Sequence, residues 1–365
     1  MRPCYIILLL ALTCASCCRN EDRREQQLLI AYIATDNDLE FDGTPKVEGL
    51  RLASKVSKFK ILVYVDRNTV NPRLLLLEDG KQTTVAEYEV ENSADAAVFA
   101  RVIRDAAARY PADHYGLLFF SHAGGWLPEG VPSTPPRSRA IGNDRGREME
   151  LVDFAAAIPD RFFNYIIFEA CFTAGIEVMY ELRNKADYVM GSSAEILSPG
   201  YRDIYSAGLP CVSCMPNSLT GFAERFFAEV SSKVGDYRSA TVSIIETARL
   251  EALATAVRQA RVAHPDPPPV NPANVQRFDR LSGANYFFDM ADYIEQLYPP
   301  ATAGAILDKI KACVVYKAHT DNFMLSHNGF AINKHCGMTT YIPQPGHENL
   351  NTAYNNLAWQ KAIKN

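Results

Sequence analysis

The stretch Tyr115-Gly-Leu-Leu-Phe-Phe-Ser-His-Ala-Gly-Gly-Trp126 joins a run of apolar residues to a turn that contains a histidine and two glycines. An apolar run of this length, bounded by glycine and polar residues, is typical of a β-strand that is buried on both faces. Residues 28–34 and 165–168 are similar runs, which lead into Thr35-Asp-Asn-Asp38 and Glu169-Ala-Cys171. Strands of this kind occur in sheets that helices cover on both sides, so the sequence predicts an α/β fold with a mainly parallel sheet.

The segments around these three runs alternate between strand and helix patterns. The further predicted strands cover residues 59–65, 73–78, 83–90, 188–191, 241–246 and 337–343, and the predicted helices cover residues 46–57, 94–109, 174–183, 219–233, 249–264, 285–297 and 301–313. Residues 265–272 contain five prolines and are predicted to form a loop or linker. Because the helical patterns become longer beyond residue 210, we predict an α/β domain over residues 28–214 and a C-terminal subdomain over residues 215–365 that packs on it.

The composition excludes two classes of protein. Of the 365 residues, 48% are hydrophobic and 22% are charged, and a chain this apolar buries enough surface to fold rather than stay disordered. The formal net charge is −5 and no long basic run is present, so nucleic acid is not predicted as the main partner.

The N-terminus has the pattern of an export signal. A basic start at Met1-Arg2 precedes a short apolar core and the small-residue segment Cys14-Ala-Ser-Cys-Cys18, and the core is too short to cross a bilayer. Ala15-Ser16-Cys17 resembles the end of a bacterial lipobox, which predicts a signal peptide over residues 1–16, a lipid on Cys17 and a tether over residues 17–27. We therefore expect an exported protein anchored in the bacterial cell envelope, at the outer membrane or cell surface. An ordinary signal peptide is the alternative, and lipidation of Cys14 or Cys18 also stays open.

A histidine and a cysteine follow two of the predicted strands. His122 and Cys171 lie 49 residues apart, and the carboxyl ends of parallel strands meet at one edge of a sheet. A cysteine thiol becomes a nucleophile when an imidazole takes its proton, and the amides of a glycine-rich turn can stabilise an oxyanion. A core thiol and an ordinary turn are the simpler interpretations of each feature alone, but their joint occurrence at two strand ends favours nucleophilic catalysis.

No metal centre or cofactor is predicted. Cys211 and Cys214 have the spacing of a zinc-binding pair, but no second pair completes a site, and His319, His327 and His335 are interpreted as structural. The acidic loop that contains Asp36, Asp38, Glu40 and Asp42 allows calcium without indicating it, because it lacks the spacing of an EF-hand. We expect this loop to be solvated or to orient neighbouring turns.

The motifs taken together resemble those of a known family. Residues 33–40 (Ile-Ala-Thr-Asp-Asn-Asp-Leu-Glu), 121–126 (Ser-His-Ala-Gly-Gly-Trp) and 168–171 (Phe-Glu-Ala-Cys) are similar, in order and spacing, to three signatures of the clostripain-like cysteine peptidases, which belong with caspases, legumains and gingipains. The resemblance implies a caspase-like catalytic domain and an endopeptidase that acts on proteins or peptides. It also implies a nucleophile at Cys171, a proton-handling partner at His122, and oxyanion donors at the amides of Ala123, Gly124 and Cys171.

The resemblance leaves substrate specificity open. Glu169, Glu195 and Asp203 are implied to bind substrate, and the family uses the acid two residues before the cysteine to bind arginine or lysine. This chain has Glu169 where the family usually has aspartate, and legumain-like enzymes with Glu-Ala-Cys prefer asparagine. A further segment of the family is resembled by residues 195–203 (Glu-Ile-Leu-Ser-Pro-Gly-Tyr-Arg-Asp), and the charge of Arg202 near the same pocket would neutralise Glu169 and weaken a preference for basic residues. A lipid-anchored binding protein without turnover is the alternative from another functional class.

A loop next to the histidine motif is a candidate for self-cleavage. Residues 128–136 contain five prolines or glycines, and Arg137, Arg139, Arg145 and Arg147 follow. An exposed, arginine-rich loop beside the active site suits autoprocessing after arginine. A solvated loop that is never cut is the alternative.

Overall fold

The computed structural model describes residues 25–68, 70–129, 131, 140–212, 218–280 and 285–364. The predicted signal peptide and Cys17 lie outside these ranges, as do Cys214, Arg137 and Arg139. The prediction of a lipid anchor and that of self-cleavage at either of these two arginines therefore remain predictions.

A nine-stranded sheet forms the centre of the molecule, in the order β12-β10-β9-β8-β5-β1-β2-β3-β4. The strands are β1 (Glu25–Thr35), β2 (Lys60–Arg67), β3 (Val70–Glu78), β4 (Lys81–Glu87), β5 (Ala112–Phe120), β8 (Phe163–Glu169), β9 (Ala186–Gly191), β10 (Thr241–Glu246) and β12 (Val314–His319). The five central strands, β2, β1, β5, β8 and β9, pair in parallel, and the strands at both edges pair antiparallel. The predicted α/β fold with a mainly parallel sheet is confirmed.

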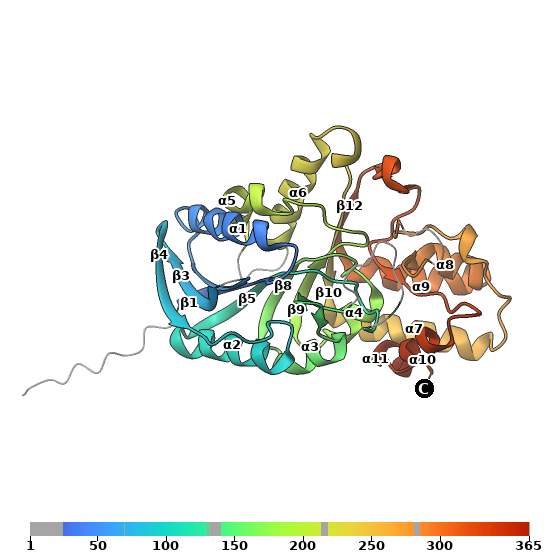
Figure 1. Ribbon diagram of the computed structural model, residues 1–365. Coiled ribbons are helices and arrows are strands. Elements are labelled where there is room, and N and C mark those ends of the chain that lie inside the picture. The colour runs from blue at the N-terminus through green and yellow to red at the C-terminus, as the bar shows by residue number, and fades with distance from the viewer. Residues whose placement is uncertain are drawn as a thin grey trace, which may run out of the picture.

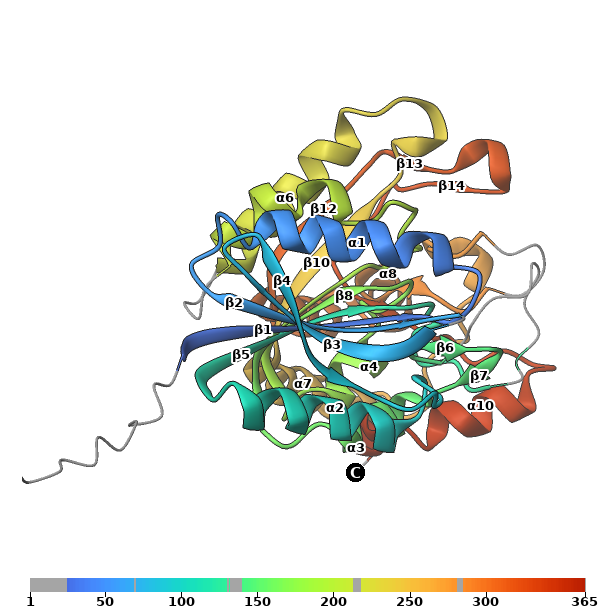
Figure 2. The ribbon, with the colours of Figure 1, turned by 60° about the vertical axis from the view of Figure 1, so that its left-hand side comes forward.

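Helices cover both faces of the sheet (Figures 1 and 2). One layer contains α1 (Glu40–Ala53), α5 (Tyr205–Gly208) and α6 (Ser218–Ser231), and the opposite layer contains α2 (Ala96–Arg109), α3 (Leu151–Ala157), α4 (Ile176–Glu181) and α7 (Leu250–Ala263). Because side chains alternate along a strand, β1 sends Leu28, Ile30 and Tyr32 into one core and the residues between them into the other. This two-sided burial explains the uninterrupted apolar runs in the sequence.

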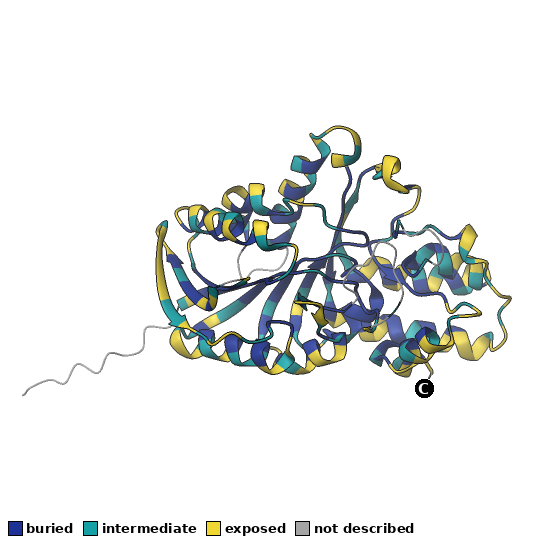
Figure 3. Ribbon diagram, in the orientation of Figure 1, coloured by how far each residue is buried: buried dark blue, intermediate teal, exposed yellow. Residues whose placement is uncertain are grey.

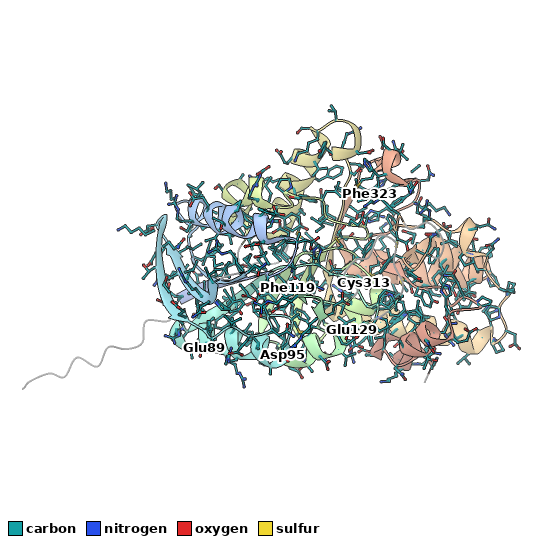
Figure 4. The ribbon with its side chains drawn as sticks, in the orientation of Figure 1. Glu89, Asp95, Phe119, Glu129, Cys313 and Phe323 are labelled. Atoms are coloured by element: carbon teal, nitrogen blue, oxygen red, sulfur yellow. The ribbon has the colours of Figure 1, made fainter. Side chains whose placement is uncertain are left out.

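Burial follows the layers closely (Figure 3). The central strands are buried along most of their length, whereas the helices expose their outward faces. Phe119 of β5, labelled near the middle of Figure 4, is fully buried and packs edge-on against the rings of Phe154 and Phe168. No helix within the described ranges combines the length and apolar character that crossing a membrane requires.

The C-terminal half contributes to the same sheet. Strands β10 and β12 extend it beyond β9, although both lie in the predicted C-terminal subdomain. The remaining helices, α8 (Met290–Leu297), α9 (Pro300–Cys313), α10 (Glu348–Asn355) and α11 (Ala358–Lys364), gather at that end of the molecule (Figure 1). One sheet thus takes strands from both predicted units, and the division of the chain between residues 214 and 215 stays a prediction.

Several elements differ from the sequence-based expectations, among them helices α10 and α11, which were not predicted. Strand β12 was not predicted, because it follows α9 without a turn and its half-buried residues at the sheet edge lack a long apolar run. The helix predicted over residues 285–297 begins only at Met290, since β11 (Phe288–Asp289) pairs with β15 (Thr339–Thr340) and Asp289 caps the helix. The last predicted strand, over residues 337–343, is reduced to β15, which lies outside the main sheet.

Candidate active site

His122 and Cys171 lie at the same level of the sheet. Strands β5 and β8 are parallel neighbours, and their register pairs Phe120 with Glu169. His122 follows Phe120 by two residues, and Cys171 follows Glu169 by two residues, so both side chains emerge just beyond the carboxyl edge of the sheet. The two residues line one cavity of about 680 Å³.

The acidic loop after β1 supports the histidine. Asp38 Oδ1 lies 2.6 Å from His122 Nε2, although the Asp38 side chain is 84% exposed. A carboxylate only accepts hydrogen bonds, so this contact places the imidazole proton on Nε2 and leaves Nδ1 to exchange a proton with a reacting group. The loop was expected either to be solvated or to orient neighbouring turns, and the contact of Asp38 with His122 agrees with the second expectation.

The surroundings of Cys171 favour negative charge on its sulfur. The amide of Ile196 donates to Cys171 Sγ at 3.4 Å. Burial lowers the pKa of Arg280, whereas a negative charge on Cys171 raises it. The guanidinium of Arg280 is therefore close enough to interact electrostatically with the sulfur. An amide donor and a nearby cation are features that make a cysteine nucleophilic.

The second glycine of the histidine turn packs against the cysteine turn. Gly125 has φ +65°, and a Cβ atom added there would lie 2.6 Å from the carbonyl oxygen of Phe172, the residue after the cysteine. Phe172 itself adopts φ +58° and donates its amide to the carbonyl of Ala194 at 3.0 Å. Glycine is thus required where the two turns touch, rather than where a ligand approaches.

The predicted oxyanion donors separate into two groups. Ala123 and Cys171 line the cavity, whereas Gly124 does not. The amide of Gly124 donates to the carbonyl of Ala140 at 2.9 Å, because the turn pairs with the segment around Ile141. The prediction that Gly124 supplies an oxyanion donor is therefore wrong for this structure, and Ala123 and Cys171 remain candidates.

Each of the three acids implied to bind substrate is paired with a base. Glu169 is buried and pairs with Lys46 Nζ at 2.6 Å. Glu195 pairs with Arg280 Nε at 2.5 Å, and both of these acids line the cavity. Asp203 pairs with Arg202 at 2.9 Å and is not among the residues that line the cavity.

The expected role of Arg202 is therefore wrong. Its Nε contacts the neighbouring Asp203 instead of Glu169. The cation beside Glu169 is Lys46 of α1, a residue that sequence analysis assigned only to a helix. The only sequence signal for this ion pair was a lysine on the apolar face of a helix. That signal suggests a buried partner but does not identify the carboxylate.

A group of three buried carboxylates lies behind the acidic loop. One oxygen from each of Asp36, Asp66 and Asp144 lies within 4.8 Å of the others, and burial raises the pKa of Asp66 to about 6. Arg145 contacts Asp36 and lies 3.9 Å from Asp144 Oδ1. Of the four acids considered for calcium, only Asp36 belongs to this group. The contact of Arg145 with Asp36 thus links the segment around Arg145 to the loop after β1 that contains Asp38.

The other cysteines and histidines that the structure describes are not among the residues that line the cavity. None of the cysteines in the described ranges forms a disulfide, and Cys313, labelled in Figure 4, is fully buried. His327 pairs with Asp236 at 2.7 Å, and His335 contacts Ser193 at 3.2 Å and lies edge-on to the ring of His319. The structural interpretation of the three histidines agrees with these contacts.

Comparison with known proteins agrees with the fold. The sequence profile of the Clostripain family matches residues 31–264, which is more than half of the chain. Clostripain from Hathewaya histolytica is 25% identical over 224 residues, which cover 50% of this chain and only 42% of that protein. The chain therefore spans less than half the length of this relative.

Two solved structures match almost the whole chain. A secreted C11 cysteine protease from Bacteroides thetaiotaomicron, in complex with an irreversible peptide inhibitor, is 26% identical with a TM-score of 0.80, covering 93% of this chain and 98% of its own. An inactive zymogen C11 protease from Parabacteroides distasonis is 26% identical with a TM-score of 0.82, covering 94% of this chain and 99% of its own. By its profile match and its caspase-like α/β fold, the chain belongs to the clostripain family.

Proposed function

We propose that this chain is an exported, lipid-anchored cysteine endopeptidase that uses a Cys171–His122 dyad. The observation that carries the proposal is the matched register of β5 and β8, which brings the two residues to the wall of one cavity. The names of the related structures, a secreted protease and a zymogen, support export and peptide hydrolysis in this family.

The geometry supports a two-step acyl transfer. His122 Nδ1 takes the proton of the Cys171 thiol, and the sulfur attacks the carbonyl carbon of the substrate. The amides of Ala123 and Cys171 are the proposed donors to the oxyanion of the tetrahedral intermediate. The C–N bond then breaks, the amine leaves with the proton held by His122, and water hydrolyses the thioester with His122 as the base.

Asp38 is a positioning residue in this scheme. Its contact with Nε2 holds the ring so that Nδ1 faces the reacting groups, and it stabilises the imidazolium that forms during attack. Because Asp38 is largely exposed, solvent screens this interaction and its contribution is modest. We propose that the reaction uses no metal or cofactor, since this dyad needs none.

Selective alkylation tests the dyad. We expect iodoacetamide to modify Cys171 at least about tenfold faster than Cys211, with loss of peptidase activity in proportion, because a thiolate is the reactive form. Burial raises the pKa of Cys313 to about 12 and also raises that of Cys336, so both should stay unmodified. Peptide mapping by mass spectrometry gives the order of labelling.

The same experiment separates the enzyme from the alternative. Uniformly slow labelling of Cys171 and Cys211, together with no hydrolysis of any peptide, would favour a binding protein that retains the fold without turnover. Adding EDTA or calcium to the assay checks the proposal that no metal is needed, and a loss of activity in EDTA would contradict it.

The lipid anchor makes a separate prediction about the mature N-terminus. We expect the native protein to begin at Cys17, with the mass of a lipid added to its sulfur, because Ala15-Ser16-Cys17 resembles a lipobox. Intact-mass measurement of protein isolated from membranes is the test. A mature chain that starts at Arg19 or later, without acyl mass, would make the enzyme a freely secreted one.

The resemblance also suggests cleavage after arginine or lysine, with cleavage after asparagine as the alternative. The pairing of Glu169 with Lys46 weighs against the basic preference, because the acid that would bind a substrate cation already has a cation beside it.

A further inference from the structure

Residues 192–196, which follow β9, bond to the turn that contains the proposed nucleophile. The carbonyl of Ala194 accepts from the amide of Phe172 at 3.0 Å, and the amide of Ile196 donates to Cys171 Sγ at 3.4 Å. Phe172 has φ +58°, and a residue other than glycine keeps such a backbone conformation only where its surroundings hold it. The position of this segment therefore decides the conformation of the cysteine turn and places an amide at the sulfur.

A threonine from the C-terminal half of the chain holds this segment. Thr241 begins β10, which is the antiparallel neighbour of β9 (Figure 1). Its hydroxyl shares a hydrogen bond with the hydroxyl of Ser192 at 2.7 Å and accepts from the amide of Ala194 at 3.1 Å. Both distances are ordinary for hydrogen bonds of these types. The Thr241 side chain is thus connected, through Ala194, to the amide of the residue after Cys171.

The residues of this network are buried, so water does not replace a lost partner. Ser192 and Ala194 are 0% exposed, and Thr241 is 1% exposed. The amide of Ala194 also donates to the hydroxyl of Ser192, over a longer distance of 3.3 Å. Without the Thr241 hydroxyl, a buried hydroxyl and a buried amide lose their shorter bonds, and a buried polar group without a partner is costly. We expect the segment to move toward other partners and the cysteine turn to move with it.

We propose that Thr241 is a positioning residue for Cys171. Its hydroxyl acts through Ser192 and Ala194 to keep the cysteine turn in the conformation that presents the sulfur to the amide of Ile196. A donor that bonds to the charged form of a group favours that form, so the thiolate forms at lower pH while this amide is in place. Thr241 is not among the residues that line the cavity, and it therefore acts through its neighbours. This inference rests on the proposed peptidase function.

The test replaces the threonine with valine, which has the same shape without the hydroxyl. In Thr241→Val we expect kcat to fall at least about tenfold while KM changes less than about twofold, because the nucleophile is displaced and the substrate contacts stay. The rate at which iodoacetamide alkylates Cys171, followed against pH, should have its midpoint shifted upward by at least about 0.5 pH units. The constants kcat and KM are measured with the best substrate of a peptide panel that varies the residue before the scissile bond, P1.

Two further variants separate positioning from stability. Thr241→Ser keeps the hydroxyl, and its kcat and alkylation midpoint should equal those of the wild type. Thr247 directly follows β10 at its other end, is also buried, and donates its hydroxyl to the carbonyls of Ala186 at 2.6 Å and Asp187 at 3.1 Å. Thr247→Val should therefore lower the unfolding temperature about as much as Thr241→Val and leave kcat and the midpoint unchanged. Equal changes of kcat and midpoint in the two valine variants, or in Thr241→Ser, would indicate a merely structural role and overturn the inference.

A variant of the partner hydroxyl keeps the test decisive if Thr241→Val does not fold. Ser192→Ala removes the 2.7 Å bond from its other side and should shift the alkylation midpoint in the same direction. An unshifted midpoint in Ser192→Ala would overturn the inference and leave the peptidase function intact. A wild type that hydrolyses no peptide would instead overturn the proposed function, and alkylation of its Cys171 would still show whether Thr241 positions the thiol.

Discussion

Replacing Cys171 with alanine is expected to abolish peptide hydrolysis, with kcat/KM reduced by at least about 10⁴-fold. The thioester cannot form without the sulfur, and no serine or threonine is proposed to replace it. Hydrolysis of the best P1 peptide, measured with wild type and variant at equal folded concentration, gives the result. The variant should fold, because Cys171 lies beyond the end of β8 and only its side chain changes.

Variants of the other two residues should form a graded series. His122→Ala is expected to lose about 10²–10⁴-fold in kcat, because the imidazole serves as both base and acid. Asp38→Asn keeps the shape of the side chain and is expected to lose about tenfold or less, since the aspartate acts through an exposed contact. Full activity in Cys171→Ala, or a larger loss in Asp38→Asn than in His122→Ala, would contradict these roles.

Gly125→Ala is expected to lower activity by about 100-fold or more without removing either member of the dyad. The added Cβ would lie 2.6 Å from the carbonyl oxygen of Phe172, so the histidine turn and the cysteine turn must move apart. A shift of about 1 Å between reacting groups costs about 100-fold in rate. We also expect the free energy of unfolding to fall by about 2–4 kcal/mol, from backbone strain and overpacking together.

A second glycine provides the matched control. Gly235 has φ +60°, close to the value for Gly125, but a Cβ added there has no atom within 4 Å. Gly235→Ala therefore carries the same backbone strain without the contact, and it should cost about 1–2 kcal/mol of stability and leave activity unchanged. Urea unfolding and peptide hydrolysis are measured for both variants. Equal activity in the two would show that the contact with Phe172 does not set the geometry of the site.

The main features of the catalytic half could be predicted from the sequence because they follow from local patterns. Continuous apolar runs mark strands buried on both faces, and the carboxyl ends of parallel strands lie at one edge of a sheet. These two rules place His122 and Cys171 together, and the register of β5 and β8 confirms the placement. The C-terminal half was predicted less well, since β12 lies at a half-exposed edge and β15 is only two residues long.

The polar partners within the cavity were decided by the tertiary structure alone. Lys46 and Glu169 are 123 residues apart in the chain, and Glu195 and Arg280 are 85 residues apart. The sequence shows which residues carry charge, and it suggested Arg202 for Glu169 because both lie in segments that resemble the family. The energy of an ion pair depends on the distance between its atoms and on the solvent that packing excludes. Both are fixed only when α1 packs on the sheet. The sequence by itself therefore predicted the proposed nucleophile and its partner, but only the fold determined what lies beside Glu169.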